Sequence, residues 1–313
     1  MKPANVSTRS WTAVTRRYSF LCWSILFLPA HLSGRQEKSV PIQLIGGEAR
    51  LEIVDERGDS SWSSYYAREV PAYLKACESY TAIPFHATAA PFYESLPADR
   101  RWEVRLIGRE KVFLNGVWVG GYNNSSGIYG DDRGIFVEYG RTAVREPALV
   151  LHELGHFWFY SIPWLSEGIV SFLPLVLNAE GLLSLSPAEL KSIWVSWGFR
   201  QVPAGGDQPT EVDFRASGGD SFLLWYNKTF KVQYIICREL GMQKYMDFLR
   251  LVAERGPRLE SSADVLDILQ SLRSADWRRL LSGWVFDGPY RDYPWEFFRD
   301  ESLSGTFVGP PPQ

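Results

Sequence analysis

The sequence predicts an α+β fold, with a small mixed α/β lobe that includes an edge strand, followed by a mostly helical lobe. Short β-like runs bounded by turn residues are concentrated before residue 140, and longer stretches with helical spacing follow residue 146. Strands on one side of the chain and helices on the other, rather than strict alternation, are typical of α+β proteins. The 313 residues suffice for one large domain or two smaller lobes.

The first 34 residues predict a signal peptide or membrane anchor. Residues 1–17 contain four basic side chains and no acidic one, and residues 18–33 are apolar and almost uncharged. A basic head followed by a short apolar run is typical of export signals. The run is shorter than the ~20 apolar residues that span a bilayer comfortably. We therefore expect a periplasmic, extracellular or outward-facing anchored protein, and membrane association through residues 18–33 stays open.

Residues 40–144 form the expected mixed lobe. The β-like runs are 42–45, 51–54, 103–107, 111–114 and 135–139. Residues 62–80 have helical spacing, although Pro71 should kink or divide this helix. Residues 115–134 are rich in Gly, Asn and Asp, and predict a hairpin or loop.

Residues 145–300 form the expected helical lobe, because the spacing of apolar residues changes near 140–145. The expected helices are 147–160, 166–179, 187–197, 226–240, 242–255, 261–272 and 275–286. A proline-rich end, 301–313, predicts a disordered tail.

Composition excludes some classes of function. The net charge is −3 and no basic run alternates with aromatic residues, so we expect no nucleic-acid partner. Three cysteines are too few for a disulfide scaffold or a cysteine-built zinc site. Cys77 and Cys237 either pair in an oxidising compartment or are two buried thiols. The sequence gives no indication of the oligomeric state.

One motif predicts chemistry: His152-Glu153-Leu154-Gly155-His156 is an H-E-x-x-H sequence within a stretch of helical spacing. Positions i and i+4 share one face of a helix, so His152 and His156 can bind one metal ion. Neutral imidazole nitrogen suits Zn²⁺. Glu153 points away from this pair and can hydrogen-bond a metal-bound water as a general base.

The third ligand separates the possible families. A metzincin would have Gly at 159 and His at 162, but these positions hold Phe159 and Ile162. Downstream, Trp164-Leu165-Ser166-Glu167-Gly168 resembles the W-L-[NS]-E-G signature of gluzincins, the zinc peptidases of the aminopeptidase-N and peptidase-MA-like group. The resemblance implies a zincin-like fold with Glu167 as third ligand. The interval of ten residues after His156 is shorter than in the larger aminopeptidases, and Glu180 is the fallback acid.

Local geometry gives independent support to Glu167. We expect the first helix to run to Tyr160 and the chain to reverse at Pro163. Ser166 would then be the N-cap of the next helix, with Glu167 in its first turn. In an antiparallel pair of helices, Glu167 and His156 would lie at a similar depth.

Tyr226 is the second catalytic candidate. Tyr226-Asn227-Lys228-Thr229 is similar to the Y-x-K-G segment of aminopeptidase-like gluzincins, although Thr229 replaces the glycine. The resemblance implies that the Tyr226 hydroxyl stabilises an oxyanion. Alternatively, Tyr226, Phe230 and Tyr234 form a buried stripe at helical spacing.

In gluzincins an edge strand before the metal helix pairs with the extended substrate, which implies this role for Ile135–Glu138. The same residues could be an ordinary interior strand. No G-x-M-E-N-like segment, the anchor for a free amino terminus in the larger relatives, is visible in the sequence, so exopeptidase activity has no support.

Together these features predict an exported zinc metallopeptidase that acts on a peptide or protein. One Zn²⁺ ion would be held by His152, His156 and Glu167, and a zinc-bound water activated by Glu153 would attack the peptide bond. The alternative is a non-catalytic envelope binding protein on a zincin scaffold.

Overall fold

The computed structural model describes residues 34–87, 102–114, 117–125, 133–139, 147–194, 208–213, 215 and 221–288. These residues fall within one unit of the chain, Ser33–Gln313. The apolar run 18–33 and the predicted tail 301–313 lie outside the described residues. A mixed sheet and a larger group of helices confirm the predicted α+β class.

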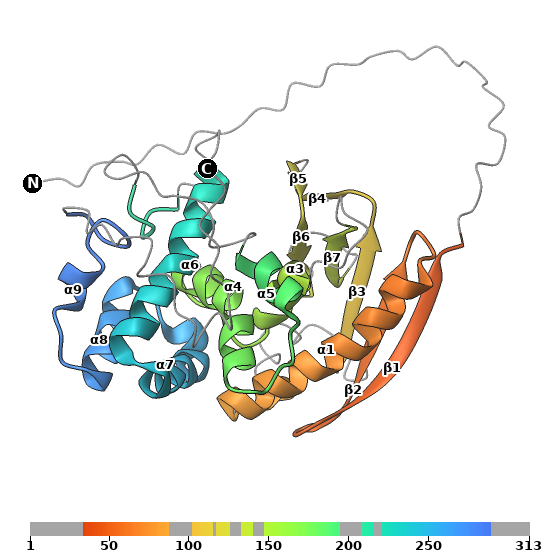
Figure 1. Cartoon of the computed structure of the whole chain (residues 1–313), viewed down its shortest axis with the longest axis horizontal. Coiled ribbons are helices and arrows are strands. Elements are labelled where there is room, and N and C mark those ends of the chain that lie inside the picture. Colours follow the sequence, from red (N-terminus) through yellow and green to blue (C-terminus); the bar gives the residue numbers. More distant parts are fainter. Residues whose placement is uncertain are drawn as a thin grey trace, which may run out of the picture. The chain divides into compact units, whose positions relative to one another are not determined.

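The main sheet has the strand order β1-β2-β3-β7-β6 (Figure 1). Its strands are β1 (Gln36–Leu44), β2 (Gly47–Asp55), β3 (Glu103–Arg109), β6 (Gly121–Asn123) and β7 (Ile135–Glu138). The central strands β2, β3 and β7 are parallel, and β1 and β6 are antiparallel to their neighbours. A separate hairpin joins β4 (Val112–Leu114) to β5 (Val117–Val119).

The expectation that Ile135–Glu138 is an edge strand is wrong. This segment is β7, which pairs with β3 on one side and with β6 on the other. Its apolar residues are all at most 2% exposed, as expected for a strand covered on both faces. Among the described strands the two edges are β1 and β6, and β6 lies within the segment predicted as a hairpin or loop.

Helix α1 (Ser60–Thr81) connects the parallel strands β2 and β3 and lies along the sheet (Figure 1). The side chain of Asp59 caps its first turn by accepting from two backbone N–H groups. The helix continues through Pro71, so the predicted division is wrong. An interior proline costs ~3 kcal/mol, and burial of a long aromatic and aliphatic face offsets this cost.

The remaining helices follow the predicted order with different ends. They are α3 (Pro147–Gly155), α4 (Pro163–Ala179), α5 (Pro187–Ile193), α6 (Ser221–Leu240), α7 (Met242–Arg255), α8 (Ser262–Leu272) and α9 (Trp277–Leu280). The prediction of a helix over 275–286 is largely wrong. The backbone turns after Leu280, where Gly283 adopts a positive φ of 74° that glycine tolerates best.

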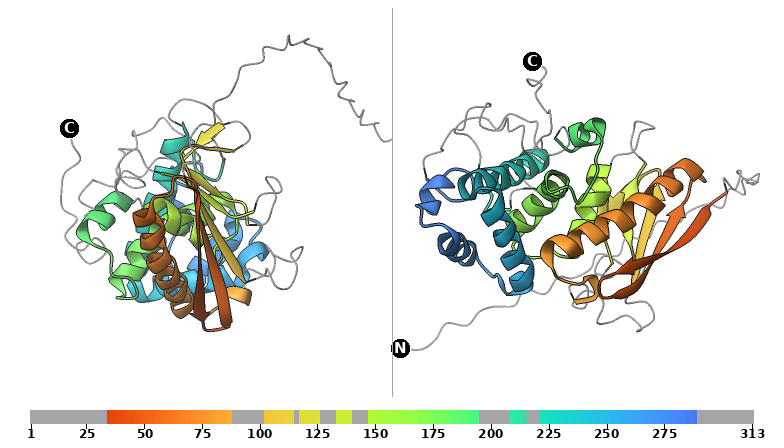
Figure 2. Two further views of the ribbon diagram at one scale, coloured as in Figure 1. Left: turned by 90° about the vertical axis from the view of Figure 1, so that its right-hand side faces the viewer. Right: turned by 60° about the horizontal axis from the view of Figure 1, so that its bottom comes forward.

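Helix α4 is central to the helical region. It is apolar nearly all round, and residues Ile169–Leu177 are fully buried, as expected for a helix inside a core. It packs between α3 and α6 and lies between the sheet and helices α6 to α8 (Figures 1 and 2). The sheet and the helices contribute to one continuous hydrophobic core. The division of the chain near residue 144 stays a prediction.

Two further observations concern the cysteines and the hydrophobic character of the helices. Cys77 and Cys237 are buried and form no disulfide bond with each other, so the alternative of two buried thiols holds. No helix in the described part of the chain combines the length and apolar character needed to cross a membrane.

Candidate metal centre

His152 lies in α3, and His156 follows the last residue of this helix. This helix ends at Gly155, and the prediction that it continues to Tyr160 is wrong. A helical i+4 to i hydrogen bond nevertheless follows the helix, because the Phe159 N–H donates to the Gly155 carbonyl at 3.0 Å. The rings of His152 and His156 therefore lie on one side, with centroids 5.0 Å apart and planes at 85°.

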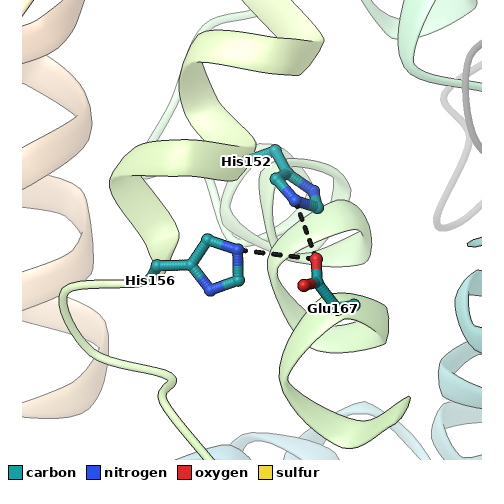
Figure 3. A group of neighbouring side chains, drawn as sticks. All are labelled: His152, His156 and Glu167. Atoms are coloured by element: carbon teal, nitrogen blue, oxygen red, sulfur yellow. Dashed lines mark ion pairs between the residues drawn. The ribbon is translucent and has the colours of Figure 1, made fainter. Parts of the chain in front are cut away.

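Glu167 projects from α4 toward both rings (Figure 3). Its Oε2 atom lies 3.1 Å from Nε2 of His152 and 3.5 Å from Nε2 of His156. Helix α4 begins at Pro163 rather than Ser166, so the predicted N-cap is wrong and Glu167 lies in the second turn. The convergence that the sequence predicted is nevertheless present.

These three residues fit a zinc ion. Their ligand atoms all lie within 4.8 Å of one another. Tetrahedral ligands bound at ~2.1 Å from one ion are about 3.4 Å apart, close to both Oε2–Nε2 distances. Oε2 of Glu167 is also buried without a hydrogen-bond partner among the described atoms. A cation between the three side chains would satisfy this oxygen, and two imidazoles with one carboxylate are a donor set of catalytic zinc sites.

Two serines of α4 orient the histidine rings. Ser171 Oγ lies 2.9 Å from Nδ1 of His152, and Ser166 Oγ lies 3.3 Å from Nδ1 of His156. Each serine hydroxyl donates to a backbone carbonyl, that of Glu167 at 2.8 Å and that of Phe159 at 2.5 Å. Each serine oxygen therefore accepts from Nδ1–H, which leaves the lone pair on Nε2 free to bind a metal.

The electrostatics of the cluster favour a positive charge. Burial raises the pKa of Glu167, but the two imidazoles outweigh this effect and hold it well below its usual value. Burial lowers the pKa of His156, but the carboxylates of Glu167 and Glu153 together raise it, and the net shift is upward. Glu167 is therefore held as a carboxylate, and a cation beside it is stabilised.

Glu153 is the buried acid beside this cluster. Only 6% of the residue is exposed, and burial raises the pKa of its carboxyl despite the opposing effect of the two imidazoles. Its backbone carbonyl accepts from Nδ2 of Asn123 at 2.9 Å, which ties the edge strand β6 to the metal helix α3. A raised pKa suits a group that must accept and release a proton.

Tyr226 faces the same cluster from α6, which begins five residues earlier than predicted. Its ring centroid lies 6.0 Å from that of His152. The close approach of α6 to α4 depends on Gly168, because a Cβ there would lie 2.6 Å from the Thr229 carbonyl oxygen. The buried-stripe alternative holds for Phe230 and Tyr234, which are fully buried, whereas Tyr226 is only partly buried.

Glu180, the fallback acid, is wrong as a ligand. It is exposed at the C-terminal end of α4, thirteen residues beyond Glu167 and thus about 20 Å away along the helix.

Sequence reasoning missed three groups. The two serines flank Glu167 at positions i−1 and i+4 of the same helix, so helical spacing could have identified them. Arg215 donates from one nitrogen to Glu167 Oε1 and to the Tyr226 hydroxyl oxygen, each at 3.2 Å, and no sequence pattern marks it.

The sequence matches no protein-family model and no curated protein. Its fold is similar to that of solved zinc peptidases. An M1 zinc metallopeptidase mutant from Deinococcus radiodurans has a TM-score of 0.51 at 14% identity over 83% of this chain. A two-domain M1 zinc metallopeptidase mutant bound to L-arginine has a TM-score of 0.51 at 15% identity over 83% of this chain. Aminopeptidase A of Legionella pneumophila, in complex with aspartic acid, has a TM-score of 0.50 at 12% identity over 82% of this chain.

The comparisons confirm the fold that the resemblance implied, which is that of the gluzincin aminopeptidases. The chain spans only part of these proteins, 53% of each M1 metallopeptidase and 28% of the Legionella aminopeptidase.

Proposed function

We propose that the protein is a zinc-dependent metallopeptidase that hydrolyses peptide bonds in a peptide or protein substrate. The observation that carries this proposal is the convergence of His152, His156 and Glu167 on one point beside the buried Glu153. A purely structural metal site needs no such acid, because its ligands complete the coordination. The similar fold of solved zinc peptidases gives further support.

Each residue has a distinct role in this reaction. A zinc ion bound by the three ligands would supply Lewis acidity toward the substrate carbonyl and lower the pKa of a water molecule. Glu153 would accept a proton from the attacking water as the new C–O bond forms. It would then return this proton to the departing amine when the C–N bond breaks. The Tyr226 hydroxyl would donate to the oxyanion of the tetrahedral state, a contribution of about 2.7–4 kcal/mol by analogy with other oxyanion donors.

We propose that the substrate binds along β6. Among the described strands, β6 lies at one edge of the main sheet and β1 at the other, and β6 is tied to α3 through the bond from Asn123 to the Glu153 carbonyl. An extended peptide can add to such an edge through main-chain hydrogen bonds that do not depend on side-chain identity. We therefore assign the pairing with substrate, which was expected for Ile135–Glu138, to the adjacent strand β6.

The test compares Glu153→Gln with Glu180→Gln, an exposed acid of the same type far from the site. Hydrolysis of a quenched fluorescent peptide library is measured together with the zinc content of each purified protein. We expect Glu153→Gln to retain zinc and lose at least 100-fold in rate, which is the contribution typical of a general base. Glu180→Gln should match the wild type, and a chelator should abolish its activity. Unchanged hydrolysis by Glu153→Gln would refute the mechanism.

We also propose that the protein is exported, on the basis of residues 1–34 alone. Fractionation of cells that express the full chain, compared with a chain lacking residues 1–34, tests this proposal. Recovery of the full chain in the cytoplasmic fraction would contradict it.

A further inference from the structure

Arg215 contacts the carboxylate oxygen of Glu167 that does not face the histidines. Its Nη1 donates to Oε1 of Glu167 at 3.2 Å, whereas Oε2 of the same carboxylate faces the two imidazoles. The two carboxylate oxygens of Glu167 therefore contact different groups. One is engaged by a guanidinium, and only the other is directed at the point where the histidines converge.

The same nitrogen of Arg215 also donates to the hydroxyl oxygen of Tyr226, at 3.2 Å. A guanidinium Nη carries two hydrogens, so Nη1 can make both bonds at once. Because the Tyr226 oxygen accepts from Arg215, this bond does not use the hydroxyl hydrogen. Arg215 thus connects the third metal ligand with the proposed oxyanion donor.

Arg215 is itself held in place by its neighbours. Asp213 accepts from Nε at 2.9 Å and from Nη2 at 2.7 Å, which is a bidentate, charge-assisted pair. The guanidinium also lies over the ring of Trp225, 4.5 Å from its centroid. Asp213 offsets the positive charge of Arg215, which would otherwise oppose a dication bound on the other side of Glu167.

We propose that Arg215 is a positioning residue for the proposed peptidase reaction. It holds Glu167 so that a single oxygen is presented to the metal, and it fixes the position of the Tyr226 hydroxyl oxygen. This inference rests on the proposed function for its catalytic part. Its metal-binding part needs no substrate and can be tested separately.

The first measurement is zinc affinity, by competition with a chromophoric chelator, for Arg215→Met, Arg215→Lys and Asp213→Asn. The control is Arg273→Met, which removes a surface arginine that pairs with Glu239 at 3.5 Å. We expect Arg215→Met to weaken zinc binding 10- to 100-fold, as is typical when an outer partner of a ligand is removed. Lysine should not restore the affinity, because it lacks the planar fork that pairs with Asp213 while donating to Glu167.

Asp213→Asn keeps the arginine but loses its bidentate anchor and the compensating charge. Since its side chain is 42% exposed, the fold should tolerate this change, and we expect weaker zinc binding in the same direction. Removing a cation near the metal could instead strengthen binding through simple electrostatics. Unchanged or tighter binding in Arg215→Met, or full rescue by lysine, would therefore overturn the positioning role.

The second measurement is peptide hydrolysis by Arg215→Met, Tyr226→Phe and the double variant at saturating zinc. We expect each single variant to lower kcat more than it raises KM, and the double variant to be no worse than the poorer single one. Additive losses would show that the two side chains act independently, which would contradict the link between them. If the wild type cleaves no peptide, the proposed function fails, while the zinc affinities still decide whether Arg215 positions Glu167.

Discussion

The Oγ atom of Ser171 lies 2.9 Å from Nδ1 of His152, and the hydroxyl hydrogen of Ser171 is already committed to the Glu167 carbonyl. One side chain therefore relates two of the three proposed metal ligands, His152 and Glu167. The Ser171 oxygen fixes the tautomer of His152. The Ser171 hydroxyl also donates a hydrogen bond to the backbone carbonyl of Glu167, one helical turn earlier. The metal centre is built by α4 as much as by the motif helix α3.

This relationship predicts that Ser171→Ala weakens zinc binding. Without the serine oxygen, the His152 ring loses the acceptor for Nδ1–H in a place where only 3% of its side chain is exposed. We expect the zinc dissociation constant to rise 10- to 100-fold, and Ser166→Ala, whose contact is longer at 3.3 Å, to have a smaller effect. Competition titration measures both constants.

The control for this prediction is Ser271→Ala in α8. Its hydroxyl also donates to a helix carbonyl, that of Ile268 at 2.7 Å, but it belongs to a different helix. This variant should bind zinc like the wild type. Equal affinities for Ser171→Ala and Ser271→Ala would show that the serine does not orient the ring.

The convergence of His152, His156 and Glu167 could be predicted from sequence because their geometry is local. His152 and His156 are separated by one helical turn, and Glu167 follows after a single reversal of the chain. The exact helix ends mattered little: α3 is five residues shorter than predicted and α4 begins three residues earlier, yet the ligands still converge. Short-range spacing determines this part of the site.

Long-range packing determines the rest, and the sequence does not reveal it. Ile135–Glu138 lies inside the sheet and β6 lies at one edge, because β7 pairs with both β3 and β6, and the residue pattern of a strand does not show how many partners it has. Arg215 reaches Glu167 across 48 positions of the chain. No periodicity marks such a contact, so the predicted site contained the ligands and the base but lacked the arginine.

Metal removal should lower the stability of the fold, because a ligand that binds only the folded state stabilises it. We expect a chelator to lower the thermal midpoint of the wild type by several degrees, since Glu167 and the histidines then remain buried without their cation. Glu167→Gln should show little zinc and little further change with chelator, whereas Glu180→Gln should behave like the wild type. Scanning calorimetry with and without chelator measures the midpoints, and a zinc-replete Glu167→Gln protein would exclude this acid as a ligand.

The glycine after the third ligand should be sensitive to substitution for a steric reason. A Cβ at Gly168 would lie 2.6 Å from the Thr229 carbonyl oxygen, so Gly168→Ala must push α6 away from α4. We expect a loss of about 1–3 kcal/mol in the free energy of unfolding, as for other overpacked sites. Urea denaturation of the variant and the wild type measures this loss.

Gly155 provides the comparison for this prediction. A Cβ added at Gly155 would lie 2.9 Å from the Val170 side chain. Unlike a backbone carbonyl, this side chain can be replaced by a smaller one through a second substitution. We expect Gly155→Ala to be destabilising and to be partly rescued by Val170→Ala, because the second change makes room for the added methyl group. A Gly168→Ala protein as stable as the wild type would show that α4 and α6 can separate without cost.

Lys231 predicts a pH-dependent stability. This residue of α6 is 3% exposed, and burial lowers the pKa of its ammonium group from 10.5 to about 8. Between these two pH values the unfolded chain binds more protons than the folded one, so the stability of the wild type rises with pH there. Below pH 8 the folded protein carries the whole free-energy cost that corresponds to this change in pKa, and above pH 10.5 this cost is absent.

Replacing the lysine with an apolar side chain of similar length should therefore be stabilising at neutral pH. We expect Lys231→Met to raise the free energy of unfolding by up to about 3 kcal/mol at pH 7, the value that corresponds to the change in pKa. This advantage should shrink at pH 9.5, because the folded wild type has then lost most of its buried charge. Lys244→Met, at an exposed position of α7, should show no such trend in parallel urea titrations. A stability difference that stays constant from pH 7 to 9.5 would mean that the Lys231 ammonium group is as well solvated in the folded protein as in the unfolded chain.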